Sequence, residues 1–204
     1  VALFNTDWKN IQAKGVDPVT GTSFQGNGGR AHTRGLEVEG RWRVNSALAV
    51  GGNAAFTEAK LDEDINITGI NAKKDNTIPF VPKLAFGLTA DYSAEVLPGV
   101  MGVFGTTVRH VGQRRAYFDD TQVGTGVQSL VGKMPAYDLV DLRAAFIKDI
   151  WTLSLMVKNV FDKRGITTVN GSYIGPGTAP GSLSPAGVTI TQPRTIGVTL
   201  RADF

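Results

Sequence analysis

The chain has 204 residues, 42% of them hydrophobic, and a formal net charge of +3, a composition that excludes an intrinsically disordered chain. It contains no cysteine, which excludes disulfide scaffolds, thiol nucleophiles and cysteine-ligated metal sites. It has only two histidines, so a nitrogen-rich metal site is not expected. No apolar run approaches the roughly 18 residues of a membrane-spanning helix, whereas a mean hydropathy of −0.04 is compatible with the alternating strands of a membrane β-barrel. The first residues lack the features of a signal peptide, so a mature chain or a fragment is expected.

Apolar and polar residues alternate with a period of two in several segments. In residues 35–44, Leu36, Val38 and Trp42 alternate with charged side chains, which indicates a strand with one apolar and one wet face. The same alternation appears in residues 83–92, 151–158 and 195–204. Followed along the chain, it predicts eight strands, at about residues 1–12, 34–44, 47–58, 81–93, 100–114, 136–147, 150–161 and 192–204.

The connections between these strands alternate between short and long. Residues 45–46, 94–99 and 148–149 form the short ones, and the others are polar, rich in Gly and Pro, and about twenty to thirty residues long. If successive strands run up and down, all short connections fall on one side and all long loops on the other. Outer-membrane barrels have this asymmetry, with short periplasmic turns and long extracellular loops.

The two faces of the strands differ in size and charge. Alternation alone does not distinguish a soluble barrel from a membrane barrel, but long charged side chains suit a wide wet lumen better than a filled interior. The apolar face carries aromatic residues near strand ends, as interfacial girdles do: Trp8, Trp42, Tyr92, Trp151 and Phe204. The side chains expected to face the lumen are Glu37, Glu39, Arg41, Arg43, Asp91, Arg109, Asp141, Arg143, Lys158 and Arg201.

The predicted fold is therefore an all-β, transmembrane, antiparallel up-and-down β-barrel with about eight strands in this chain. Because every backbone group in lipid needs an internal partner, these strands must close on themselves or join strands from elsewhere.

Three motifs resemble the barrel of TonB-dependent outer-membrane receptors. Residues 34–40, with the sequence RGLEVEG, resemble the family's "RGxE" strand. Residues 137–164 are similar to its penultimate hairpin, which ends in N-x-F-D-K, and residues 192–204 resemble its closing strand. The resemblance covers nearly the whole chain in the family's order.

This resemblance implies a ligand-gated importer in which a 22-stranded barrel encloses an N-terminal plug and is energised through TonB. Residues 1–204 contain no plug, no TonB box and too few strands, so they are expected to form the last eight strands, as a fragment, a cleaved piece or part of a split receptor. In the family, a terminal aromatic such as Phe204 is read by the barrel-assembly machinery, and the alternative is a simple girdle residue. The expected partners are outer-membrane lipid and lipopolysaccharide, the remainder of the barrel and its plug, the TonB complex through that plug, and the assembly machinery.

The long loops are where ligand recognition is expected. Cations and aromatic residues there could bind an anionic chelate or stack on a sugar, although for any single candidate an ordinary exposed loop residue is the favoured interpretation. The candidates are Phe24, Arg30, His32, Arg114, Arg115, Tyr117, Phe118, Asp119, Asp120 and Tyr173. The acidic run at residues 62–64 lacks the spacing of a calcium loop and is interpreted as solvated charge.

No catalytic motif, metal site or cofactor site is expected, because the Ser, phosphate-loop and zinc signatures are all absent and residues 26–30 form a Gly-rich segment without a following helix. A net charge of +3 spread over alternating strands makes no basic patch for nucleic acid. The function expected is part of a bacterial outer-membrane receptor that imports a scarce nutrient, an iron chelate or a carbohydrate. The alternatives are a self-contained eight-stranded barrel with an anchoring or adhesion role and, from another class, an outer-membrane hydrolase.

Overall fold

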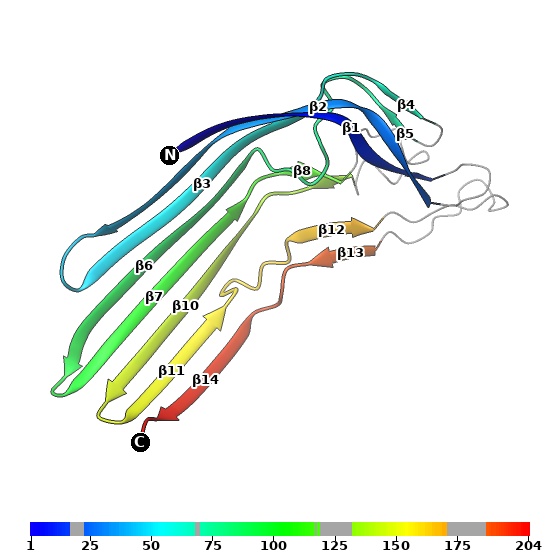
Figure 1. Cartoon of the computed structure of the whole chain (residues 1–204). Helices are drawn as coiled ribbons and strands as arrows, with labels where there is room; N and C mark the ends of the chain where they lie inside the picture. The colour runs from blue at the N-terminus through cyan, green and yellow to red at the C-terminus, as the bar shows by residue number, and fades with distance from the viewer. Residues whose placement is uncertain (17–22, 68–69, 117, 119–131, 171–186) are drawn as a thin grey trace.

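The computed structural model describes residues 1–16, 23–67, 70–116, 118, 132–170 and 187–204. Eight strands form one antiparallel sheet in the order β1-β2-β3-β6-β7-β10-β11-β14, which is the order of the sequence (Figure 1). The strands are β1 (Ala2–Val16), β2 (Ser23–Arg43), β3 (Leu48–Leu61), β6 (Leu84–Leu97), β7 (Val100–Val111), β10 (Tyr137–Lys148), β11 (Trp151–Lys158) and β14 (Thr195–Ala202). The all-β, antiparallel up-and-down prediction is confirmed.

Three small hairpins grow from the long connections. They are formed by β4 (Ile65–Ile67) with β5 (Ile70–Ala72), β8 (Arg114–Arg115) with β9 (Lys133–Met134), and β12 (Ile166–Asn170) with β13 (Gly187–Ile190). All three lie at the same end of the curved sheet (Figure 1). In the described ranges, no helix is long and apolar enough to cross a membrane.

The tight turns lie at the opposite end of the sheet (Figure 1). The Asn45 side chain caps one of them by accepting the backbone N–H groups of Ala47 and Leu48, both at 2.8 Å. Glu95 Oε1 accepts the N–H of Gly99 at 2.7 Å in the next, where Gly99 has a φ of 74°. Asp149 has a φ of 49° in the third, so local turn chemistry fixes all three short connections.

The first hairpin differs from the sequence-based expectation. A long loop was expected from residue 13 to residue 33, but β1 continues to Val16 and β2 begins at Ser23. The Gly-rich segment is therefore strand, and its missing side chains leave room for a neighbour: a Cβ at Gly28 would lie 2.9 Å from Cδ1 of Ile65, and one at Gly26 would lie 3.2 Å from Cδ1 of Ile67. Because glycine shows no alternation, the pattern of the sequence could not reveal this strand.

The register places all ten side chains that were expected to face the lumen on one face of the sheet. Directly opposite residues point to the same side, and one row runs from Arg43 through Ala49, Asp91 and Gly105 to Arg143. Rows above and below it bring together Glu37, Glu39, Arg41, Arg109, Asp141, Lys158 and Arg201 on what we call the charged face. Leu36, Val38, Trp42 and their row partners make up the opposite, apolar face.

The apolar face carries large exposed side chains instead of a core. Trp42, Leu88, Leu155 and Val198 are 65%, 51%, 39% and 68% exposed. Trp8 does not belong to this face: Leu3 pairs with Leu36, so Trp8, which pairs with Ala31, points to the other side. The expectation of a Trp8 girdle residue is therefore wrong, because the apolar residues of β1 do not all point to one side: Leu3 faces the side of Leu36 and Trp8 faces the other.

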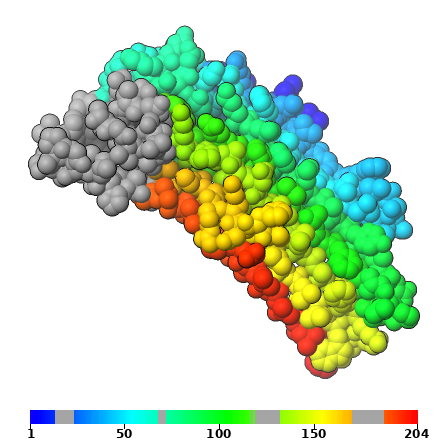
Figure 2. All heavy atoms as spheres, turned by 180° about the vertical axis from the view of Figure 1, so that it is seen from behind, coloured from blue at the N-terminus to red at the C-terminus, as the bar shows by residue number. Residues whose placement is uncertain are grey.

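The sheet is open. Strands β1 and β14 form its two edges, and no pairing joins them in the described part of the chain (Figures 1 and 2). The count of 22 strands and the place of residues 1–204 at the end of a larger barrel stay predictions.

Candidate functional site

A polar trough crosses the charged face over β2, β3, β6 and β7. It has a volume of about 890 Å³, and its lining includes Glu37, Glu39, Arg41, Asp91 and Arg109. The central strands present small residues there, namely Gly51, Asn53 and Ala55 from β3 and Ala85, Gly87 and Thr89 from β6. Small residues between long charged ones leave space, so this face can accept a polar partner.

Two ion pairs stand at the far side of the trough. Arg109 Nη2 donates to Asp141 Oδ2 at 2.7 Å, and Arg143 reaches across β7 to Asp91. The crossing requires Gly105, because a Cβ there would lie 2.7 Å from Cζ of Arg143. Both arginines are more than half exposed, so each pair contributes at most about 1 kcal/mol.

The residues that β2 contributes to the charged face are not used in such pairs. Within the described ranges, Glu37, Glu39, Arg41 and Arg43 form no ion pair with another residue. Two carboxylates therefore stand at one end of the trough and two guanidinium groups follow towards the tight turns. This arrangement suits a partner with a matching pattern of opposite charge.

Arg30 and His32 do not lie on a loop. Both belong to β2 and point to the same side as Leu36, away from the trough. His32 Nδ1 lies 2.6 Å from Asp62 Oδ1, and Arg30 Nε donates to Glu63 Oε2 at 3.4 Å. Their expected place on an extracellular loop was wrong because the first hairpin is longer than its glycine content suggested.

The acidic run at residues 62–64 is more ordered than solvated charge. Besides the partners of Asp62 and Glu63, Asp64 accepts the Lys74 backbone N–H at 2.8 Å and Lys73 Nζ at 3.0 Å. These bonds, the Lys74 N–H first, hold the pKa of Asp64 below its usual value. Among the described residues, no group of three or more His, Cys, Asp or Glu side chains is placed to hold a metal.

Arg114 is a buried connector, not an exposed loop residue. It is 8% exposed, its Nη2 donates to the carbonyl of Ile166 at 2.9 Å, and its guanidinium lies 5.6 Å from the centre of the Tyr137 ring. It therefore ties the β8–β9 hairpin to the β12–β13 hairpin. The expected exposed placement was wrong, because a guanidinium with five donors can satisfy loop carbonyls in a buried site.

The other candidates have different surroundings. The backbone carbonyl of Arg115 accepts the Phe80 N–H at 2.7 Å, and Phe118 packs against a cluster that includes Ile11, Leu61 and Ile65. Phe24 packs against the same cluster. Tyr117, Asp119, Asp120 and Tyr173 lie outside the described residues.

Asn159 organises the base of the last long loop, a role that the motif match alone did not reveal. Its backbone N–H donates to Asp141 Oδ1 at 2.8 Å. Its side chain donates to the carbonyls of Lys163 and Gln192 at 3.0 and 2.7 Å and accepts the Lys163 N–H at 2.9 Å. Thr191 completes the junction by bonding the same Lys163 carbonyl at 2.5 Å. The N-x-F-D-K sequence thus forms a turn after β11, and this turn is hydrogen-bonded to the segment just before β14.

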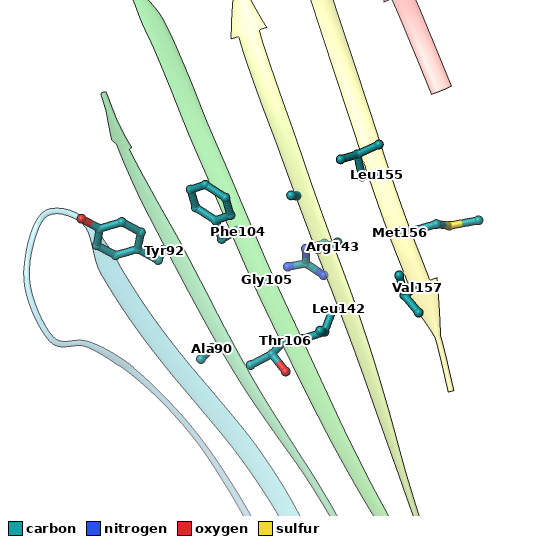
Figure 3. Close-up of a pocket in the computed structure, with 11 residues that line it drawn as sticks. Ala90, Tyr92, Phe104, Gly105, Thr106, Leu142, Arg143, Leu155, Met156 and Val157 are labelled. Atoms are coloured by element: carbon teal, nitrogen blue, oxygen red, sulfur yellow. The ribbon is translucent and has the colours of Figure 1, made fainter. Parts of the chain in front are cut away.

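The apolar face also has a hollow. Tyr92, Phe104, Leu142, Leu155 and Val157 surround about 430 Å³ on β6, β7, β10 and β11 (Figure 3). Its lining is almost entirely apolar, which fits a surface that faces lipid.

Comparison with known proteins agrees with this arrangement. Residues 1–160 match the family model described as TonB dependent receptor-like, beta-barrel. The chain is 28% identical over 174 residues to the ferrichrome outer membrane transporter/phage receptor of Escherichia coli K12, covering 84% of this chain and 21% of the transporter. It thus spans about a fifth of that relative's length.

Solved structures share the fold. The ferric yersiniabactin uptake receptor of Yersinia pestis superposes with a TM-score of 0.68 at 22% identity, over 99% of this chain and 27% of the receptor. The ferric preacinetobactin receptor of Acinetobacter baumannii gives 0.66 at 16% identity, over 99% and 26%. The open antiparallel sheet, with one apolar face and a polar trough on the other, agrees with these matches. The chain belongs to the β-barrel family of TonB-dependent receptors of the bacterial outer membrane.

Proposed function

We propose that residues 1–204 form the C-terminal wall section of an outer-membrane receptor that imports an iron chelate with energy delivered through TonB. The observation that carries this proposal is the polarity of the sheet: an apolar outer face opposes a polar trough, and both edges are open to further strands. The named ligands of the relatives, ferrichrome, ferric yersiniabactin and ferric preacinetobactin, support iron over a carbohydrate as cargo.

In import, these residues would form part of the barrel wall and position the plug, and they would not catalyse a reaction. The remaining strands of the barrel would pair with β1 and β14, and the plug would meet the charged face at Glu37, Glu39, Arg41 and Arg43. The TonB complex would act through that plug. Lipid and lipopolysaccharide would surround the apolar face, and the assembly machinery would read Phe204.

The size of the native particle tests the barrel proposal. Extraction of the protein from its membrane should give either a species several times 21.7 kDa or a stable complex with the missing strands. A lone, heat-modifiable monomer of 21.7 kDa would instead support a self-contained eight-stranded barrel with an anchoring or adhesion role.

Uptake of radioactive iron tests the cargo. A strain that lacks the gene should lose uptake of one ferric chelate from a panel of trihydroxamate, catecholate and phenolate chelates, and the intact gene should restore it. Loss of growth on a carbohydrate with normal iron uptake would show that the cargo is a sugar. Charge reversal at Glu37 and Glu39 should reduce uptake without reducing chelate binding at the cell surface, since the trough would contact the plug and not the ligand.

A further inference from the structure

The polarity of the two faces reverses along β1, β2 and β3. Below the row formed by Leu3, Leu36, Phe56 and Leu84, apolar side chains point outward and charged ones inward. Above it, the outward positions of β2 carry Arg34, His32 and Arg30, those of β3 carry Glu58 and Lys60, and Asp62 follows directly after the end of β3. We call these six side chains the charged collar.

The inward positions change in the opposite sense. Above the same row they carry Ala31, Ala59 and Leu61, which are 2%, 2% and 0% exposed. Ala31 and Leu61 form a buried apolar cluster with Ile11, Ile65 and others, against the β4–β5 hairpin. Apolar inside and charged outside is the pattern of a protein surface in water, whereas the pattern below the row is that of a surface in lipid.

We infer that the hydrocarbon of the outer leaflet ends at the Leu36–Phe56–Leu84 row, and that the charged collar contacts the phosphate-bearing lipid headgroups directly above it. The inference deepens the proposed function and rests on it, since it assumes that the apolar face meets lipid.

The length of the apolar belt agrees with this boundary. On β2 and its turn it runs from Leu36 to Val44, nine positions, and a tilted membrane strand needs about 9 to 11 residues. Trp42, Tyr92 and Trp151 stand on the apolar face near the tight turns, where an aromatic girdle marks the other boundary.

The collar has donors to offer to phosphate. Arg34 uses Nε and Nη2 on Glu58, yet its side chain is 62% exposed and keeps further N–H groups. Arg30 is equally exposed, and Lys60 Nζ lies 3.0 Å from Glu58 Oε2. Glu58 therefore holds Arg34 and Lys60 side by side above the apolar belt, and arginine forms strong charge-assisted bonds to phosphate oxygens.

Spin labels on single cysteines test the boundary in the full-length receptor, reconstituted in vesicles of phosphatidylethanolamine and phosphatidylglycerol. This chain has no cysteine of its own, so labels can be placed with V38C, L36C, R34C and H32C. Collision with oxygen should exceed collision with a water-soluble nickel chelate at residues 38 and 36, and the order should reverse at 34 and 32. The matched control T33C, on the other face, should show no oxygen preference.

The outcomes separate the two ideas. If V38C and L36C both collide mainly with the nickel chelate, the apolar face does not meet lipid and the proposed barrel wall fails as well. If V38C is in lipid and H32C is too, only the inferred boundary is overturned.

Lipid selectivity tests the headgroup contact. Spin-labelled phosphatidylglycerol should associate with the receptor more strongly than spin-labelled phosphatidylcholine, and the triple variant R30Q/R34Q/K60Q should reduce this preference towards equality. The variant R41Q/R43Q removes cations from the charged face and should leave the preference unchanged. Equal selectivity in the triple variant and the unmodified receptor would overturn the collar's role.

Discussion

At the scale of single residues, glycines that allow close approach and one asparagine that bonds a turn are needed for the local geometry of the sheet. Gly35 lies inside the RGxE motif, and a Cβ there would clash with the backbone carbonyl oxygen of Phe56 and lie 2.7 Å from Cζ of Phe4. Asn159 is 4% exposed and has a φ of 50°, a conformation that asparagine tolerates better than most residues. The motif residues are therefore required for close packing and turn geometry.

Gly35→Ala should destabilise the sheet by about 1–3 kcal/mol, because the added Cβ meets backbone that cannot move without disturbing the β2–β3 ladder. Urea titration in lipid vesicles measures the change. Gly40→Ala is the matched control in the same strand, since a Cβ there meets nothing within 4 Å. Equal losses in the two variants would contradict the steric explanation.

Asn159→Ala should cost about 1–3 kcal/mol, because it removes the side-chain bonds that Asn159 donates to the carbonyls of Lys163 and Gln192 and places alanine at positive φ. Asn159→Gly loses the same bonds, but glycine adopts a positive φ without strain, so its loss of stability should be smaller. Amide exchange of residues 187–191, followed by mass spectrometry, should rise in both. Unchanged exchange there would show that the junction does not hold the loop base.

Asp162 should give the same turn a dependence on acid. The backbone N–H of Arg194 at 2.8 Å, and then the Arg164 side chain, hold the pKa of Asp162 below its usual value. A lowered pKa in the folded state means that the contribution to stability is complete above the pKa of an unfolded aspartate and disappears as the pH falls through the folded value. The difference in urea midpoint between the unmodified protein and Asp162→Ala should be constant at neutral pH and vanish in strong acid. A difference that persists there would argue against the carboxylate as its source.

At the scale of elements, the long connections are built as hairpins that dock on their neighbours. The β4–β5 hairpin packs Ile65 into the space that Gly28 leaves on β2, and Arg114 links β8 to the start of β12. These contacts join segments about 35 to 50 residues apart in the chain. The described parts of the long connections therefore pack against one another and against the sheet, with two buried apolar clusters between them.

Gly28→Val should push the β4–β5 hairpin away from β2, because Ile65 is 2% exposed and has no free space to move into. Limited proteolysis should then cut within residues 62–78, a region that stays protected in the unmodified protein. Gly40→Val serves as the control. Protection in both variants would mean that the hairpin is held by other contacts.

At the scale of the whole molecule, the two faces of the sheet suit two different environments, one polar and one apolar. The charged face collects ion pairs and an open trough, and the apolar face exposes large hydrophobic side chains over most of its strands. Both edges have backbone groups without a strand partner in the described part of the chain, and in lipid such groups must pair with each other or with further strands.

Neighbouring residues of β14 should therefore respond in opposite ways to the same substitution. Val198→Arg places a charge on the apolar face and should cost up to about 2–4 kcal/mol or block insertion, whereas Thr199→Arg adds one more cation to the charged face and should be tolerated. Folding into vesicles, followed by heat-modifiability on gels, distinguishes them. The reverse order would show that the faces are assigned the wrong way round.

The sequence by itself determined the number of strands in the main sheet, their antiparallel order and the residues that share a face. These follow from a period of two and from turn residues, both of which are local properties that survive in a single chain. The N-x-F-D-K motif begins directly after the last residue of β11, three residues before the expected strand end at residue 161, and the motif does not reveal the bonds that Asn159 makes.

Only the tertiary structure decided the rest. The length of the first hairpin, the phase of Trp8, the burial of Arg114 and the level at which the faces exchange polarity all depend on contacts between distant segments. A glycine strand shows no alternation, and an arginine looks the same in sequence whether it binds loop carbonyls or faces water. Which of these applies is settled by the neighbours that folding brings beside it, and a local pattern carries no information about them.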